Sequence, residues 1–473
     1  MKRPGKRPGK RPGKRPGKRP GKRPGKRPGA KSAGDGVVLK AGARVSEHRL
    51  RNGLRVLIAE RHADPIVAVM LFYGVGSRNE REEEAGVSHF LEHMMFKGTR
   101  RIGKGEIDRI TTLLGGSNNA YTSNDHTGYW FELASDRWET ALEIEADRMR
   151  NLALDADEFD AERSVVLEEL SMSEDDPWRV LARRVQAALF PHHPYGRPII
   201  GFTQTLEHMD VAAMRDYYRR FYHPGNATLV VCGDVKRGTA LAKVRKAFGK
   251  IPAGPPREQA DSFRLEPAEP AGEQRLEVTW DDPAKRLCMA WPTVPVAHED
   301  DWALDLIVSV LVSGRMSRLQ RRLVLDGGLA VSVSASNDAR VDSGVFWLFA
   351  QCAQDVEPRA LEAAIDEELA RLRDETVPAA ELKRAKAVIA AGEAFESEGI
   401  SDVAEELGSC AVDSDWRIAL DGGARHARVT ARQVRDCAAR LLRDDRRIVG
   451  WSLPRAEQPE RTSGRAKRSG RRA

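Results

Sequence analysis

The pattern His89-x-x-Glu92-His93 constrains the fold of this chain more than any other feature of its 473 residues. Residues three and four apart lie on the same face of an α-helix, so a helix would bring the two imidazoles and the carboxylate together. Two imidazoles at this spacing can hold one zinc ion, and a carboxylate beside them can accept a proton from a water molecule. The pattern H-x-x-E-H therefore predicts a metal site on a helix, with Glu92 as a general base.

The neighbouring residues are consistent with this helix. Gly86 and Val87 form a short loop before Ser88, which is expected to be the N-cap, and Lys97 and Gly98 end the segment. A five-residue match also arises by chance, and the alternative is a pair of packed or exposed histidines without a metal. A third ligand from elsewhere in the chain would distinguish the two interpretations.

A helix predicted at residues 157–172 offers that third ligand. Glu162 and Glu169 share one face of this helix with two valines, at the spacing i, i+3, i+4 and i+7. Carboxylates on an otherwise apolar face are costly unless they are paired or bind a metal. We therefore predict Glu169 as the third zinc ligand and Glu162 as a hydrogen-bond partner of a ligand histidine, with an ordinary ion pair as the alternative for Glu162. Glu168 points about 100° away from Glu169 and is expected to be solvated.

Further segments accompany the metal motif along most of the chain. They lie at residues 53–57, 65–73, 74–78, 86–99, 119–122 and 222–226, and an apolar strand follows at 227–233. With the glutamate-bearing helix, they make residues 45–453 resemble the family of pitrilysin, insulin-degrading enzyme and the mitochondrial processing peptidase. The resemblance implies a zinc-dependent endopeptidase that cleaves peptides or unfolded polypeptide segments.

The order of the predicted elements indicates an α+β fold with two similar halves. Strands of the first half are predicted at 54–59, 65–73, 119–123, 127–133 and 227–233, and helices at 106–114, 136–152, 157–172, 178–189, 211–221 and onward to 248. The second half repeats this order loosely, with strands at 276–280, 285–291, 330–335, 343–350 and 447–451 and helices at 300–312, 358–375 and 379–396.

These elements predict a zinc-binding half at 45–250, a linker at 251–271 and a homologous half without the zinc motif at 272–453. The linker is predicted from its proline and glycine content. The resemblance implies two tandem α/β-sandwich halves that close as a clamshell around the substrate.

The resemblance also implies how a peptide substrate binds beside one Zn²⁺ per chain. The strand that carries Asn119, Ala120 and Tyr121 would hold the peptide as an added strand, through main-chain hydrogen bonds that tolerate varied sequences. For Tyr121 the alternative is an aromatic residue packed within the sheet. Asn119 is equally consistent with a turn after the glycines at 115–116.

The second half departs from the pattern of active relatives, which carry an arginine and, seven residues later, a tyrosine that hold the substrate near the zinc. Val324 and Val331 occupy these places, and Tyr222 is the last tyrosine of the chain. Aliphatic side chains donate no hydrogen bonds, so oxyanion stabilisation from this half is missing. Either the chain is a crippled peptidase, or another polypeptide supplies the pair. Because some bacterial relatives divide the labour in this way, the resemblance implies a heterodimer in which a homologous subunit supplies the arginine and the tyrosine. A homodimer is the alternative assembly, and a non-catalytic assembly or binding protein of the same fold is the alternative function.

The net charge of +7 arises from the first residues of the chain. Residues 2–29 are seven copies of Lys-Arg-Pro-Gly with fourteen positive charges, so the remainder carries about −7 (7 minus 14). Proline and glycine in every repeat disfavour helix and strand, so residues 1–44 are predicted to be a disordered tail and linker, with a second basic tail at 454–473. The repeats contain no aromatic residue for base stacking, so nucleic acid is not the expected partner.

Cysteine content and hydropathy bear on the cellular location. The five cysteines are odd in number and scattered, which does not indicate a disulfide framework. No run approaches the ~18 apolar residues of a membrane span, and the charged N-terminus lacks the apolar segment of a secretory signal. The expected location is the cytoplasm, or the periplasm if the start of the chain is mis-assigned.

Overall fold

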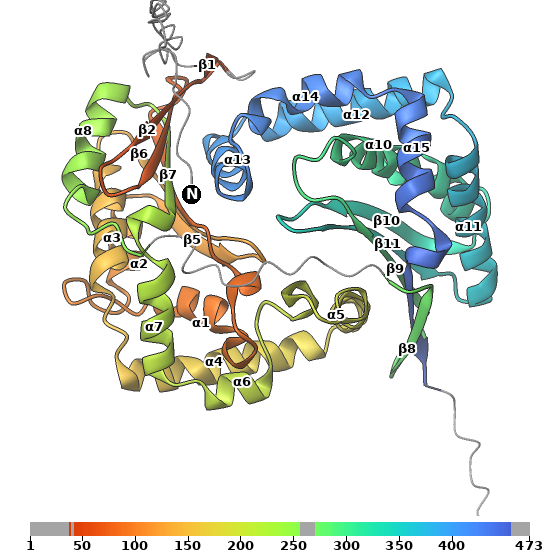
Figure 1. Cartoon of the computed structure of the whole chain (residues 1–473), viewed down its shortest axis with the longest axis horizontal. Helices are drawn as coiled ribbons and strands as arrows, with labels where there is room; N and C mark the ends of the chain where they lie inside the picture. Colours follow the sequence, from red (N-terminus) through yellow and green to blue (C-terminus); the bar gives the residue numbers. More distant parts are fainter. Residues whose placement is uncertain (1–36, 39–41, 256–269, 456–473) are drawn as a thin grey trace, which may run out of the picture. The chain divides into compact units, whose positions relative to one another are not determined.

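The computed structural model describes residues 37–38, 42–255 and 270–455. Gly36–Ala473 form one compact unit, whose helices and strands are drawn in Figure 1. The Lys-Arg-Pro-Gly repeats, the basic tail after 455 and most of the predicted linker at 251–271 lie outside the described residues. Within the described part of the chain, no helix is both long enough and apolar enough to cross a membrane.

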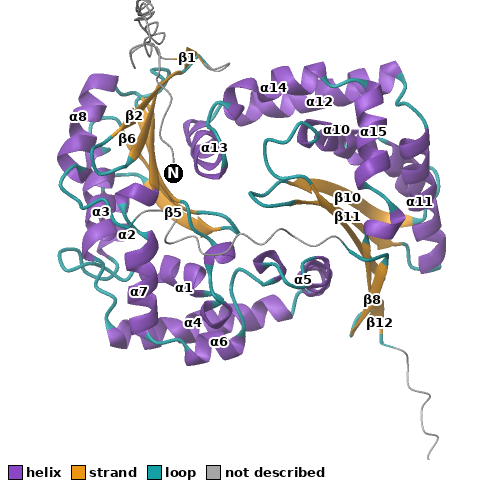
Figure 2. Cartoon of the chain, viewed as in Figure 1, coloured by secondary structure: helices purple, strands orange, loops and turns teal. Residues whose placement is uncertain are grey.

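A mixed sheet of seven strands forms the first half, in the order β1-β2-β3-β7-β4-β6-β5 (Figures 1 and 2). The strands are β1 (Val37–Val38), β2 (Arg44–Arg49), β3 (Arg55–Glu60), β4 (Ile66–Tyr73), β5 (Ser117–Thr122), β6 (Thr127–Ala134) and β7 (Ala227–Gly233). Among the described strands of this sheet, only β3 and β7 pair in parallel. Every residue of β7 is buried, as are all but the first of β4, because both faces of the central strands are covered.

The described first half contains eight α-helices. They are α1 (Val87–Met94), α2 (Glu106–Leu113), α3 (Glu139–Asn151), α4 (Ala156–Glu174), α5 (Pro177–Leu189), α6 (Thr203–His208), α7 (Val211–Phe221) and α8 (Arg237–Phe248). Apolar side chains of α1, α3, α4, α7 and α8 form the main core against one face of the sheet. The helix that carries the H-x-x-E-H pattern is thus held within this core.

The second half contains a five-stranded sheet in the order β10-β11-β9-β12-β8. The strands are β8 (Gln274–Trp280), β9 (Arg286–Thr293), β10 (Ala330–Asp338), β11 (Gly344–Cys352) and β12 (Ile448–Pro454). The helices are α10 (Asp301–Val312), α11 (Pro358–Asp374), α12 (Ala379–Glu396), α13 (Ile400–Asp413), α14 (Ile418–Arg428) and α15 (Ala431–Leu441), and Gln320–Leu325 form a short π-helical segment.

The predicted α+β class and the two sheets are confirmed by this arrangement. Most predicted elements exist within a few residues of their expected ends. The prediction omitted β1, β2, α6 and three consecutive helices, α13, α14 and α15. Strand β1 lies within residues 1–44, where a disordered tail and linker was predicted. That prediction was wrong for residues 37–38, because they pair with β2. The apolar residues of α13 do recur at helical spacing, at Ile400, Val403, Ala404 and Leu407, so its helical pattern was present in the sequence.

The two halves exchange helices. Helix α13 of the second half packs on the first sheet, where Leu407 and its apolar neighbours join Ala68, Met70 and Phe72 of β4 in one buried cluster. Conversely, α5 of the first half packs on the second sheet, where Leu181 lies in a cluster with residues of β9, β11 and β12. Each sheet therefore has one face covered by a helix from the other half.

This exchange predicts different responses from two glycines within helices. A Cβ at Gly408 of α13 would overlap the ring of Phe72, whereas a Cβ at Gly392 of α12 would meet no heavy atom within 4 Å. Gly408→Ala should lower the free energy of unfolding by about 1–3 kcal/mol, because the buried ring cannot move aside. Gly392→Ala should raise it by about 1 kcal/mol, because alanine is the better helix former. Chemical denaturation measures both, and equal stabilisation by the two variants would contradict the close packing of α13.

Candidate metal centre

A buried carboxylate fixes the start of the motif helix. Helix α1 begins at Val87, and Gly86 is its N-cap with a φ of 97°. The Glu80 carboxylate accepts hydrogen bonds from the backbone N–H groups of Gly86, at 2.9 Å, and Ser88, at 2.8 Å. The prediction that Ser88 is the N-cap is therefore wrong. Its hydroxyl instead forms a 2.7 Å hydrogen bond with the Tyr217 hydroxyl, because the helix end is buried and a carboxylate from outside the helix takes its free donors.

Three potential metal ligands converge at this helix. One ligand atom each from His89, His93 and Glu169 lies within 4.8 Å of the other two. The Nε2 atoms of His89 and His93 lie 3.7 and 3.4 Å from the two carboxylate oxygens of Glu169. Two imidazoles and one carboxylate are the donor set of many catalytic zinc sites, which keep one further position for water or substrate. The Glu169 side chain is 45% exposed, which leaves the cluster open on that side.

The electrostatics of His89 suit a ligand. Burial, followed by the nearby His93, lowers the pKa of His89 to about 4. The imidazole is therefore neutral near pH 7, and only a neutral imidazole nitrogen can coordinate a metal. The residues present fit a zinc ion by donor type, number and spacing.

Glu162 contacts both His93 and a lysine. The Nδ1 atom of His93 lies 2.9 Å from a Glu162 oxygen, and Lys97 forms an ion pair with the other oxygen. Burial tends to raise the pKa of Glu162, but the hydrogen bonds from Lys97 and His93 hold it below its ordinary value. Glu162 therefore makes both contacts that the sequence suggested. It forms a hydrogen bond with His93, a candidate ligand, and an ion pair with Lys97. Lys97 was not predicted, although it lies one helical turn after His93.

Glu92 lies on the same helix and contacts the edge strand of the first sheet. Its Oε2 atom accepts a hydrogen bond from the hydroxyl of Thr122 on β5. Burial raises the pKa of Glu92 above its ordinary value, which makes its carboxylate a better proton acceptor. Sequence reasoning had not singled out Thr122, although this residue ends the 119–122 segment. Glu168, expected to be solvated, is exposed.

The predicted substrate-binding residues lie on β5, which has β6 as its only strand neighbour in the described sheet. The backbone N–H of Ala120 donates to the side-chain oxygen of Asn119, at 2.9 Å. The Tyr121 hydroxyl contacts His126 Nε2 at 2.8 Å and donates to Glu405 on α13. The side chain of Tyr121 is therefore packed against another element, which matches the alternative interpretation, while the open side of the strand offers main-chain groups.

Val324 and Val331 lie in different settings in the second half. Val324 belongs to the π-helical segment and packs partly against the second core. Val331 lies on the edge strand β10 and is 60% exposed. Both side chains are aliphatic, so neither can donate a hydrogen bond to a substrate.

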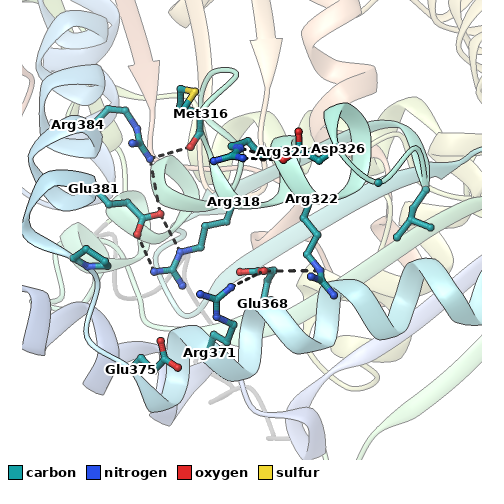
Figure 3. A pocket seen from close by; sticks show the side chains of 13 residues that line it. Met316, Arg318, Arg321, Arg322, Asp326, Glu368, Arg371, Glu375, Glu381 and Arg384 are labelled. Carbon is teal, nitrogen blue, oxygen red and sulfur yellow. Dashed lines mark hydrogen bonds and ion pairs between the residues drawn. The ribbon is translucent and has the colours of Figure 1, made fainter.

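Three arginines near Val324 line a pocket formed with α11 and α12 (Figure 3). Arg318 makes two hydrogen bonds to Glu381, at 3.0 and 2.9 Å. Arg321 pairs with Asp326, and Arg322 with Glu367. Because these guanidinium groups are already engaged by carboxylates of the same half, they are poor replacements for a substrate-binding arginine.

Comparisons with known proteins cover both halves. Residues 55–203 match the family described as insulinase (peptidase family M16), and residues 208–389 match the peptidase M16 inactive domain. An uncharacterized zinc protease of Mycobacterium leprae is 30% identical over 426 residues, which cover 87% of this chain and 93% of that protein. Zinc protease PqqE of Helicobacter pylori is 30% identical over 370 residues, with 77% and 83% covered.

A solved structure agrees with these sequence matches. The crystal structure of a protease from Helicobacter pylori aligns with a TM-score of 0.83 and 27% identity, over 87% of this chain and 100% of the other. The fold and these relatives indicate the class of protein to which the chain belongs, the zinc metallopeptidases with two α+β halves. The chain belongs to peptidase family M16, the insulinase family, which confirms the resemblance seen in the sequence.

The buried carboxylate below helix α1 generates a prediction about pH. Burial raises the pKa of Glu80 from its ordinary 4.5 to about 7. Between these values the folded state binds the extra proton, so the contribution of Glu80 to stability falls as the pH rises. From pH 5 to pH 8 the wild type should lose about 2 to 3 kcal/mol of unfolding free energy relative to Glu80→Gln, which cannot titrate. Denaturation of both proteins at the two pH values measures this. If the unfolding free energy of the wild type instead rises with pH relative to that of Glu80→Gln, the backbone hydrogen bonds lower the pKa of Glu80 by more than burial raises it.

Proposed function

We propose that this chain is a zinc-dependent endopeptidase acting on peptides or unfolded polypeptide segments, with one zinc ion held by His89, His93 and Glu169. The observation that carries the proposal is the convergence of the three ligand atoms within 4.8 Å of one another, with Glu92 on the same helix. Family membership and relatives named zinc proteases support it.

Each residue of the centre has a distinct part in peptide hydrolysis. Zinc, when bound, polarises the scissile carbonyl and lowers the pKa of a water molecule. Glu92 accepts the proton of the attacking water and passes it to the nitrogen of the leaving amine. Thr122 orients the Glu92 carboxylate through its hydroxyl, and Glu162 orients the ring of His93. The C–N bond breaks, and a carboxylate and an amine are released.

The substrate binds along the open side of β5, next to this centre. Main-chain groups of the segment at 119–121 extend the sheet by one strand, which holds a peptide extended with little demand on its sequence. Unfolded segments satisfy this requirement, whereas folded domains offer few free strands. The substrate class therefore follows from the edge position of β5.

The ligand assignment is tested with two glutamates that are adjacent in α4. His93→Ala should lose the metal, and Glu169→Gln should weaken its binding, because an amide oxygen is a much weaker ligand than a carboxylate. Glu168→Gln, the matched control, should keep stoichiometric zinc because Glu168 is exposed. Elemental analysis after dialysis measures all three. Full zinc content in His93→Ala, or loss of zinc only in Glu168→Gln, would disprove the assignment.

Glu92 is tested separately from metal binding. Glu92→Gln should retain zinc and lose nearly all hydrolysis, because the amide cannot accept the proton of water. The measurement pairs zinc content with cleavage of an unstructured, quenched fluorescent peptide. Cleavage at close to the wild-type rate by the zinc-loaded variant would rule out the role of general base.

We further propose that the chain is the metal-bearing subunit of a heterodimer. Val324 and Val331 stand where active relatives place an arginine and a tyrosine, and the nearby arginines are engaged in ion pairs. A homologous subunit with the arginine and tyrosine would complete the site. The second candidate function is a non-catalytic assembly or binding protein, which these two valines and the match to an inactive domain favour.

The two candidates predict different results from mixing. The purified chain alone should cleave the fluorescent peptide weakly, and a homologue carrying the arginine and tyrosine should raise the rate by about a hundredfold, the scale of one oxyanion donor. A mixture of that homologue with the Glu92→Gln chain is the control and should stay inactive. Strong turnover by the lone chain, unchanged on mixing, would contradict the heterodimer. Stoichiometric zinc without turnover in either sample would favour the non-catalytic protein.

A further inference from the structure

Helix α13 of the second half makes polar contacts as well as apolar ones with the first half. Glu405 accepts a hydrogen bond from the Tyr121 hydroxyl, and the same hydroxyl contacts His126 Nε2 at 2.8 Å. The other nitrogen of His126 lies 2.9 Å from Asp413, at the end of α13. Two carboxylates of α13 are thereby connected to β5 and to the turn that follows it.

These groups are shielded from solvent. His126 is buried, with its side chain 8% exposed, and Asp413 is 19% exposed. Burial tends to lower the pKa of His126, but the hydrogen bond and charge of Asp413, together with Glu405, raise it above its ordinary value. A hydrogen-bonded network in such surroundings is held more firmly than one on the surface.

The network reaches Glu92 through one peptide unit. Successive side chains of a strand point to opposite faces, so Tyr121 points towards α13 while Thr122 points towards α1. The hydroxyl of Thr122 donates to Glu92. A shift of α13 that pulls on Tyr121 therefore also moves the donor that orients the Glu92 carboxylate.

We propose that Glu405, acting through Tyr121 and Thr122, is a positioning residue for Glu92, so that the second half controls the geometry of the candidate metal centre. Asp413 supports the same strand end through His126. This inference rests on the proposed peptidase function and extends it. The second half, which lacks the zinc motif, would help to set the position of Glu92. Small misplacements of a reacting group cost large factors in rate.

Three substitutions separate positioning from simple stabilisation. Glu405→Leu removes the acceptor, Glu405→Gln keeps an oxygen that can accept from Tyr121, and Thr122→Val removes the donor to Glu92. Glu406→Leu is the matched control, because Glu406 is exposed on the same helix. All variants are full-length and zinc-loaded, and they are assayed on the quenched fluorescent peptide at an enzyme concentration high enough to follow residual hydrolysis.

The expected result is a fall in kcat of about tenfold or more for Glu405→Leu, with KM changed less than about twofold. Glu405→Gln should restore most of the rate, and Glu406→Leu should match the wild type. In the Thr122→Val background, Glu405→Leu should add little further loss, because both substitutions interrupt the same connection. Independent, multiplicative losses, or no loss in Glu405→Leu, would overturn the proposal.

A second measurement does not depend on activity. Hydrogen–deuterium exchange of residues 117–122 should be faster in Glu405→Leu than in the wild type and in Glu406→Leu. If the wild type binds zinc and cleaves no peptide, either alone or mixed with the homologue that carries the arginine and tyrosine, the peptidase proposal fails. This exchange still decides whether α13 holds β5. Unchanged exchange in Glu405→Leu would refute the connection whatever the activity.

Discussion

Burial of both faces of the first sheet is the constraint on which the rest of the structure depends. Alternate residues of β4 point to opposite sides, and Val67, Val69 and Leu71 enter one core while Met70 and Phe72 enter another. The first core is closed by helices of the same half. The second needs α13, which arrives from a distance of more than three hundred residues along the chain. Neither half can therefore bury its apolar surface alone, and the exchange of α5 and α13 makes the two halves one folded unit.

The candidate metal centre is built where this core meets buried charge. Glu92 lies on helix α1, and Glu80 and Glu162 contact this helix. Each of the three has a specific donor: the Thr122 hydroxyl for Glu92, backbone N–H groups for Glu80, and His93 with Lys97 for Glu162. A buried carboxylate without such partners would destabilise the fold. In the cluster of His89, His93 and Glu169, the two Nε2 atoms lie 3.7 and 3.4 Å from the carboxylate oxygens of Glu169. A divalent cation would balance this cluster.

Local sequence patterns predicted the helices that carry the candidate site. The helix cap and several of its side-chain contacts depend on residues far apart in the sequence. The i, i+4 spacing of the histidines and the face shared by Glu162 and Glu169 were sufficient to predict α1, α4 and the side chains that share a face of each helix, because helical periodicity sets those positions. The convergence of the two helices was predicted from the need of a zinc site for a third ligand. The cap of α1 was mispredicted because Glu80 precedes the helix by several residues and reaches it only in the folded chain. Thr122 and Glu405 were absent from the predicted site for the same reason: their roles arise from contacts between strands and helices far apart in sequence.

Among the described residues, the apolar contacts that join the second half to the first half do not involve Val324 or Val331. The sheet of the second half is covered by its own helices and by α5, and α13 supplies a face to the first half. Val324 packs partly against the second core, and Val331 is exposed on the edge strand β10. The side chains that cover the first sheet and those that would bind substrate are separate sets. A homologous chain could therefore take over the second task while this chain continues to perform the first.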